Sequence, residues 1–308
     1  MPIKKELVIQ LLSTAIEWGL TDITPIELCE GGNLIIHLAP YPIVARIATV
    51  LSEADEEFAY KILDRELSVA RYLHSKDVPV LLPTSLVEAG PHNVAGAWLT
   101  LWTYVPPTAL QPPSPSEAVD LINKLSTAMK DFEGEVPMLG VWERTCQSAQ
   151  RLRKNPDQRI QALLQVFHNM DEQMRVEPDL LQPSHGDAHA GNLIPSPEGW
   201  LWMDFEDVSL MPAYWDLASY VGNLVLFGGT QEPTFTYMLE YSELVSDQKA
   251  FGIMVSARIL MSTLGNLDFA LAGHGDLEFA TKQLELAVPI LQQIDLLINR
   301  LVKGGNIP

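Results

Sequence analysis

The stretch His185-Gly186-Asp187-Ala188-His189-Ala190-Gly191-Asn192, followed later by Met203-Asp204-Phe205, decides the fold of this chain. Four residues separate Asp187 from Asn192, and two apolar runs around a Pro/Gly turn fill residues 193–203, a pattern typical of a tight β-hairpin. Because the ends of a hairpin lie close together, we expect Asn192 and Asp204 side by side, with Asp187 on the preceding loop. Two oxygen ligands beside a third carboxylate are what metal-assisted phosphoryl transfer requires.

A purely structural explanation of the same residues is an Asx-turn followed by a helix cap, because loops are rich in Asp, Asn and Gly. The hairpin and the Asp204-Phe205 pair that follow the loop favour the phosphoryl-transfer interpretation.

The whole motif resembles that of the aminoglycoside phosphotransferase family, the small-molecule branch of the protein-kinase-like fold. That branch includes choline kinase-like, homoserine kinase-like and macrolide kinase-like enzymes. Residues 213–218, Ala-Tyr-Trp-Asp-Leu-Ala, resemble the family's next landmark, an Asp-Leu-Ala helix start. The resemblance implies an α+β, two-lobed protein-kinase-like fold. Its small N-lobe would hold an antiparallel sheet plus a helix, and its larger C-lobe would be mainly helical.

The clearest change in composition is the segment 105–115, which holds five prolines and is predicted to be extended. Short strand-like runs and one strong helix precede it, and helical patterns follow from a predicted cap at Ser116. We therefore predict an N-terminal nucleotide-binding lobe over residues 1–104, a Pro-rich hinge or linker over 105–115, and a C-terminal catalytic and substrate-binding lobe over 116–308. A long surface loop within one domain is the alternative.

In the N-terminal part, Gly31 and Gly32 join two strand-like runs, which first of all indicates a hairpin turn. In a kinase-like lobe the same turn would lie over the nucleotide phosphates, where glycines permit close backbone approach. Arg46 stands in a third, otherwise apolar run, so its guanidinium needs a partner or an exposed edge. The kinase pattern has a lysine here that holds the phosphates. Arginine also binds phosphate but with different geometry, so GTP remains possible beside ATP.

The predicted helix over residues 55–76 supports this assignment. Ile62, Glu66, Val69 and Leu73 fall on one helical face, so Glu66 lies on an apolar stripe where an unpaired carboxylate would be costly. We favour pairing with Arg46, as in the strand-to-helix ion pair of kinases. Pairing of Glu66 with a nearby arginine, such as Arg65 or Arg71, is the alternative.

Residues 84–88 and 96–104 are predicted to form a further hairpin that leads into the proline segment. By resemblance this is the hinge, where an adenine ring would hydrogen-bond to the backbone near Trp102, Thr103 and Tyr104. A buried edge strand is the alternative, and the tryptophan side chains are expected in the core.

The resemblance implies a role for each site residue. Asp187 would orient the acceptor hydroxyl and accept its proton, and Asn192 and Asp204 would bind Mg²⁺. Arg46 would hold the phosphates and Glu66 would hold Arg46. His185 and His189 have the i, i+4 spacing of a zinc pair, but the neighbouring glycines favour a loop-shaping role. We expect Asp216 to pin the loop through hydrogen bonds.

Two acidic residues, Glu206 and Asp207, follow the metal aspartate. They could contact a cationic substrate or form a solvated pair. Only eight residues separate Asp207 from Asp216, too few for a long activation loop, which disfavours protein kinase activity.

The chain has 308 residues, 39 acidic and 20 basic, with a net charge of −19. Such a charge disfavours nucleic acid and anionic membranes as partners and attracts cations, although it could serve solubility alone. The two cysteines, Cys29 and Cys146, show no metal-ligand spacing. The N-terminal residues lack the uninterrupted apolar core of a signal peptide, and we expect no transmembrane helix and a cytoplasmic location.

The predicted function is transfer of the γ-phosphate of ATP, or GTP, to a hydroxyl of a small, cationic molecule such as an aminoglycoside, with Mg²⁺ as cofactor. The alternatives are a choline, homoserine or sugar kinase-like enzyme of the same fold and a nucleotide-binding pseudokinase module. Only the arginine at position 46 favours the pseudokinase.

Overall fold

The computed structural model describes residues 2–30, 33–48, 56–240 and 243–304, and it forms two compact units. Unit 1 comprises Met1–Gln111, Glu133–Glu135 and Asn192–Glu206. Unit 2 comprises Pro112–Phe132, Val136–Gly191 and Asp207–Pro308. The fold is α+β, with the larger antiparallel sheet in unit 1 and a mainly helical unit 2.

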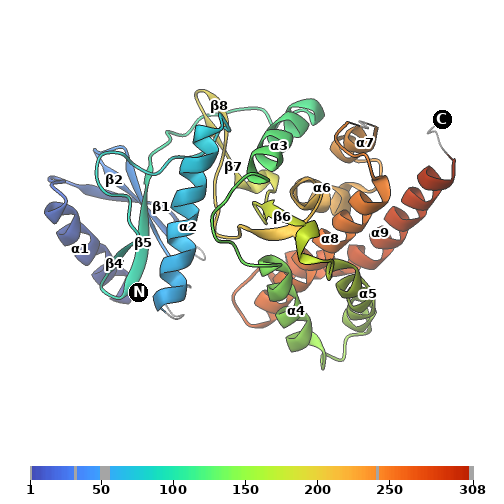
Figure 1. Ribbon diagram of the computed structural model, residues 1–308. Helices are drawn as coiled ribbons and strands as arrows, with labels where there is room; N and C mark the ends of the chain where they lie inside the picture. Colours follow the sequence, from blue (N-terminus) through green and yellow to red (C-terminus); the bar gives the residue numbers. More distant parts are fainter. Residues whose placement is uncertain (1, 31–32, 49–55, 241–242, 305–308) are drawn as a thin grey trace. The chain divides into compact units, whose positions relative to one another are not determined.

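Unit 1 is built on a five-stranded sheet whose neighbouring strands are all antiparallel (Figure 1). The strand order is β1-β2-β3-β5-β4. The strands are β1 (Thr24–Glu30), β2 (Leu34–Ala39), β3 (Ile43–Ile47), β4 (His92–Val94) and β5 (Ala97–Thr103). The three strand-like runs predicted over residues 25–30, 33–38 and 43–48 are therefore confirmed as β1, β2 and β3, with bounds that shift by one residue.

The alternation of side chains along β2 and β3 gives the sheet two different faces. Leu34, Ile36 and Leu38 are buried on one face, where they pack with Leu11 and other apolar residues of α1 (Pro2–Glu17). Arg46 lies opposite Ile35 in the strand register, on the other face. That face meets α2 (Glu56–Ser75), the helix predicted over 55–76, and Figure 1 shows α1 and α2 on opposite sides of the sheet.

The hairpin predicted from residues 84–88 and 96–104 is wrong in its first strand. The partner of β5 is instead β4, and a turn at Ala95 and Gly96 joins them. Both turn residues have positive φ, 53° and 85°, which is the conformation a two-residue hairpin turn requires. Residues 84–89 contact β5 through isolated hydrogen bonds, among them Thr84 N to Leu101 O at 3.0 Å.

A second hairpin, β7 (Leu193–Ser196) and β8 (Gly199–Trp202), confirms the one predicted after Asn192. Residues 193–202 fall within the C-terminal lobe predicted over 116–308, yet in the structure they belong to unit 1. The buried Trp202 explains this grouping, because its backbone N and O bond to Pro79 O and Leu81 N at 2.9 and 2.8 Å.

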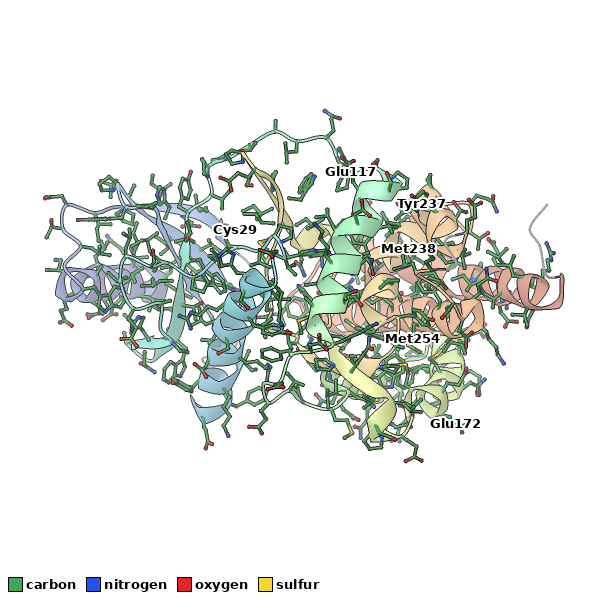
Figure 2. The ribbon with its side chains drawn as sticks, turned by 45° about the horizontal axis from the view of Figure 1, so that its top comes forward. Cys29, Glu117, Glu172, Tyr237, Met238 and Met254 are labelled. Carbon is green, nitrogen blue, oxygen red and sulfur yellow. The ribbon has the colours of Figure 1, made fainter. Side chains whose placement is uncertain are left out.

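Unit 2 contains seven of the described helices and the strand pair β6 (Leu181–Ser184) and β9 (Ser209–Pro212). The helices are α3 (Pro115–Met129), α4 (Gly140–Leu152), α5 (Gln158–Met174), α6 (Trp215–Gly228), α7 (Pro233–Glu240), α8 (Gln248–Leu271) and α9 (Leu277–Gly304). The amphipathic patterns of the sequence predict helices over residues 116–130, 156–176, 213–226, 247–271 and 277–301, which correspond to α3, α5, α6, α8 and α9, and they miss α4 and α7. The cap of α3 is Ser114, with Pro115 and Glu117 (Figure 2) in its first turn, rather than the predicted Ser116.

Helix α8 differs from the expectation that the chain has no segment resembling a membrane span. Among the described residues it is the one helix whose length and composition would allow it to cross a membrane. However, 67% of its most apolar 18-residue window is buried in the protein, as in the core helix of a folded unit.

Candidate active site

The loop that carries Asp187 lies in unit 2 and connects to β6, whose last residue, Ser184, pairs with Ser209 of β9. Gly186 has φ +86°, and a Cβ there would lie 2.1 Å from Asp207 O, so only glycine fits. The backbone N–H groups of His185 and Gly186 donate to the two carboxylate oxygens of Asp216 at 3.0 and 3.2 Å. The prediction that Asp216 pins this loop is therefore confirmed.

Burial changes the pKa of Asp216. It raises the pKa of Asp216 to about 6, with a smaller contribution from the Asp187 charge, while the two backbone donors lower it. Asp216 is 2% exposed, so the backbone hydrogen bonds replace the water that its carboxylate loses on folding.

The two histidines of the loop shape its backbone, as predicted. His185 Nδ1 accepts from Asp187 N at 3.4 Å, and His189 Nδ1 accepts from Gly191 N at 2.9 Å. Across the described residues, no group of three or more His, Cys, Asp and Glu side chains forms a metal centre, so the zinc alternative has no support there.

The structure gives Asp187 a partner that the sequence analysis missed, Arg258 on α8. Arg258 Nη2 donates to Asp187 Oδ1, and His189 Nε2 lies 3.5 Å from Asp187 Oδ2. Burial raises the pKa of Asp187, but Arg258, His189 and His185 together outweigh it and hold that pKa well below its ordinary value. Arg258 stands in an apolar run of its helix, a signal that a partner is needed, but nothing in the sequence identifies Asp187 as that partner.

Asn192 and Asp204 lie in unit 1, at the two ends of the β7–β8 hairpin. Met203 N donates to Asn192 O at 3.0 Å, so Met203 lies opposite Asn192. Asp204 is the next residue and therefore lies close to Asn192, which confirms the predicted proximity. Asp204 has φ +66°, a conformation that is uncommon for non-glycine residues and that concentrates at functional sites.

Arg46 of β3 and Glu66 of α2 form the predicted ion pair, with 2.7 Å between Nη1 and Oε2. Arg65, one of the two alternative partners, donates through Nη2 to Glu206 O at 3.3 Å. Arg46 Nη2 also contacts Asp204 Oδ1 at 3.3 Å and Glu206 Oε2. One buried cation therefore faces three carboxylates within unit 1.

This imbalance affects the titration of both partners. Burial shifts the pKa of Glu66 upward from its ordinary value, and the nearby Asp204 and Glu206 add to this shift, whereas Arg46 opposes it. Burial alone would lower the pKa of Arg46, but the attraction of Glu66, Glu206 and Asp204 raises it above its ordinary value.

The expectation for Glu206 and Asp207 needs correction. They are not a solvated pair, because each has a cationic partner within its own unit. Glu206 contacts Arg46, and Asp207 Oδ1 lies 2.5 Å from Arg144 Nη2.

A cavity of about 450 Å³ lies within unit 1, in the size range of small-molecule sites. Its wall is mainly apolar and includes Val44, Cys29 (labelled in Figure 2), Trp102, Thr103 and Tyr104, together with Arg46, Glu66 and Asp204. The predicted hinge residues thus line this cavity. Gly31 and Gly32, predicted to lie over the phosphates, fall outside the described residues.

The backbone donors of the hinge are partly occupied. Thr103 N donates to Leu82 O and Tyr104 N donates to Pro42 O, each at 2.9 Å. Trp102 is 4% exposed and its Nε1 donates to Thr100 Oγ1 at 2.8 Å, so its indole belongs to the core as expected.

The donor set of Asn192 and Asp204 fits Mg²⁺ in type and number. An amide oxygen and a carboxylate are hard oxygen ligands, and Mg²⁺ is commonly held by one or two protein carboxylates together with phosphates and waters.

The fold and these residues define a phosphotransferase of the protein-kinase-like fold. Residues 54–241 match the family model described as the Phosphotransferase enzyme family (APH), and the chain belongs to this family. No curated protein matches the chain in sequence.

Three solved structures illustrate the similarity of fold. Choline kinase LicA from Streptococcus pneumoniae is 15% identical, with a TM-score of 0.65 over 92% of this chain and 99% of its own. An aminoglycoside phosphotransferase from Alicyclobacillus acidocaldarius is 11% identical, with a TM-score of 0.56 over 94% of each chain. The amicoumacin kinase hAmiN, in complex with AMP-PNP, Ca²⁺ and Ami, is 15% identical, with a TM-score of 0.61 over 94% and 95%.

Proposed function

We propose that this protein transfers the γ-phosphate of ATP, or of GTP, to a hydroxyl group of a small, cationic molecule such as an aminoglycoside. The observation that carries the proposal is the buried Arg46–Glu66 ion pair in the wall of a cavity that Asp204 also lines. A buried arginine held by a carboxylate at the edge of an apolar cavity suits a ligand with a flat, apolar base and an anionic tail.

Unit 1 would hold the nucleotide. The base would lie against the apolar wall near Trp102, Thr103 and Tyr104, and Arg46 would bind the phosphates while Glu66 fixes its guanidinium. Asn192 and Asp204 would hold Mg²⁺, which when bound neutralises negative charge on the phosphates. Arg46 Nη2 already contacts Glu206, so an incoming phosphate would compete with that carboxylate.

In unit 2, Asp187 would accept a hydrogen bond from the acceptor hydroxyl. The reaction forms a bond between the acceptor oxygen and the γ-phosphorus and breaks the bond from that phosphorus to the β–γ bridging oxygen. The hydroxyl proton passes to Asp187 and then to water. Because its pKa is depressed, Asp187 is a weak base, so it orients the hydroxyl first and takes the proton late, as a loose transition state allows.

The net charge of −19 supports a cationic acceptor, but it does not identify which amine is the acceptor. Choline-like, homoserine-like and sugar acceptors remain alternatives within the same fold, and fold alone does not assign the substrate. The pseudokinase is less well supported, because Asp187, Asn192 and Asp204 are all present and Arg46 has its carboxylate partner. The predicted location is the cytoplasm.

The test is Mg²⁺-dependent release of ADP from ATP, and of GDP from GTP, across aminoglycosides, macrolides, choline, homoserine and sugars. Each reaction is run beside Asp187→Asn, and beside Asp131→Asn as a control at an exposed position. We expect acceptor-stimulated turnover that the control keeps and that Asp187→Asn loses by a factor of about 100 or more, since general base and positioning effects have this size.

Thermal unfolding of Asp187→Asn must accompany the assay, because the substitution also removes the counter-charge of Arg258. Turnover that Asp187→Asn retains in full would contradict the assigned role. Nucleotide binding without transfer to any acceptor or to water would favour the pseudokinase, and absence of nucleotide binding would overturn the proposal.

A further inference from the structure

Arg258 is unusual because an entire cation is buried inside unit 2 beside the proposed base. Its side chain is 5% exposed, whereas the Asp187 side chain is 26% exposed. A buried arginine without a charged partner is strongly destabilising, so the contact with Asp187 satisfies the arginine as well as the aspartate. The arginine comes from α8, 71 residues beyond Asp187.

The surrounding helices leave a defined space for this side chain. Gly222 of α6 faces it, and a Cβ at that position would lie 2.8 Å from Arg258 Cγ. Arg258 Nη1 lies 3.8 Å from Met261 Sδ, and Arg258 Nε is buried with no hydrogen-bond partner among the described atoms. Most of the donor capacity of the guanidinium is therefore unused, and its one strong contact is with Asp187 Oδ1.

The two oxygens of Asp187 are consequently not equivalent. Oδ1 accepts from the buried guanidinium, and His189 Nε2 lies 3.5 Å from Oδ2. A carboxylate that is held through one oxygen by an arginine of a packed helix has a defined orientation.

We propose that Arg258 is a positioning residue of the phosphotransfer reaction, which holds Asp187 through Oδ1 and so fixes the orientation of its carboxylate toward the acceptor hydroxyl. The inference rests on the proposed function. It adds a residue on α8 that neither the loop motif nor the match to the family model assigns.

The contact with Arg258 also affects how kcat depends on pH. The charged groups that face Asp187 determine the direction of this effect. They are Arg258 from α8, His185 and His189 from the same loop, and Asp216 from α6. When Arg258 is removed, Asp187 remains partly buried and is still repelled by the negative charge of Asp216. It has lost its strongest attraction, which is to the guanidinium. Its pKa must then rise, so the acidic limb of the kcat profile must move to higher pH.

The experiment compares kcat and KM from pH 4.5 to 9 in the wild type, Arg258→Met and Arg258→Lys, with the acceptor identified by the substrate panel. The control is Arg151→Met, which removes another arginine whose partner, Asp268, is on α8. For Arg258→Met we expect kcat to fall by about 10-fold to 100-fold, since misorientation of a reacting group has this cost. The acidic limb of its kcat profile should move to higher pH by at least one unit. The KM for the nucleotide should not change.

The other variants separate charge from geometry. Arg258→Lys keeps a cation, so its acidic limb should remain near that of the wild type while kcat falls. Gly222→Ala should lower kcat because it displaces Arg258, although alanine is otherwise favoured inside a helix. In Arg258→Ala, added guanidinium at millimolar concentration should restore part of the lost kcat, which a merely structural role would not predict.

Three results would overturn the inference in different ways. If the wild type is active and Arg258→Met keeps both its kcat and its pH profile, Arg258 has no positioning role. If Arg258→Met loses activity equally at every pH and guanidinium gives no rescue, the role is structural. A wild type that transfers phosphate to no acceptor overturns the proposed function itself, and the inference falls with it.

Discussion

Arg46 is the residue on which the charge balance of unit 1 depends. It is 8% exposed and faces Glu66, which is 1% exposed, as well as Asp204 and Glu206. If the arginine is replaced by Met, a nearly isosteric apolar side chain, Glu66 loses its counter-charge in a buried position. We expect Arg46→Met to lower the free energy of unfolding by about 3 to 5 kcal/mol, the usual cost of breaking a buried pair.

Urea unfolding at pH 7 measures this effect. The matched control is Lys61→Met, which breaks a pair with Glu57 on the same helix as Glu66 but at the surface, with side chains 66% and 76% exposed. Exposed pairs of this kind contribute little, so the control should unfold like the wild type. Equal stabilities of Arg46→Met and Lys61→Met would show that the buried pair is not formed in solution.

The two arginines of the candidate site differ in how far the sequence could identify their partners. Arg46 stands alone in an apolar strand, and Glu66 lies on an apolar helical face. Each of these charged side chains requires a partner of opposite charge, and each can serve as the partner of the other. Arg258 gives the same signal, but its contact with Asp187 depends on how α6 and α8 pack, and on the absence of a side chain at Gly222. Residue patterns do not determine helix packing at this level of detail.

Among the helices, α3 shows how a local signal can be misassigned by two residues. Its N-terminal sequence holds two serines, and the structure selects Ser114, whose Oγ accepts from Glu117 N at 3.4 Å while Glu117 Oε2 accepts from Ser114 N at 2.9 Å. Pro115 then takes the first helical position, where its missing N–H costs nothing.

This capping box leads to a prediction for a pair of variants. Ser114→Ala should lower the free energy of unfolding by about 1 kcal/mol, because the N–H of Glu117 loses its acceptor. Ser116→Ala, already inside the helix, should have a much smaller effect. Urea unfolding of both proteins tests the assignment, and a larger loss for Ser116→Ala would restore the cap predicted from the sequence.

The elements that the sequence did not predict lack such signals. Helix α4 begins after Leu139, which has φ 51° and makes no side-chain cap. Helix α7 has eight residues, and the acceptor for Phe235 N is Glu232 rather than a short polar residue. The β7–β8 hairpin, in contrast, has clear apolar runs around a Pro/Gly turn and was predicted correctly. Local chemistry therefore predicts capped helices and tight hairpins, whereas packing alone specifies the others.

At the scale of the whole molecule, the excess of acidic residues gives a net charge of −19. Such a field attracts cations and repels the nucleotide, which must still bind near a cluster of three carboxylates around Arg46. Site residues close to the phosphates must overcome this repulsion, whereas a cationic acceptor would gain from it. Salt should therefore change the binding of the two substrates in opposite directions.

We expect the KM of a cationic acceptor to rise and the KM of the nucleotide to fall as ionic strength increases at constant free Mg²⁺. The Debye length shortens from about 30 Å at 0.01 M to about 8 Å at 0.15 M, so charges beyond the immediate site stop contributing over this range. Initial rates at several salt concentrations give both constants from one set of reactions. A neutral sugar serves as the control, since its KM should not depend on salt. If the KM of the cationic acceptor were equally independent of salt, the acidic surface would have no part in substrate attraction, and the charge would be explained by solubility alone.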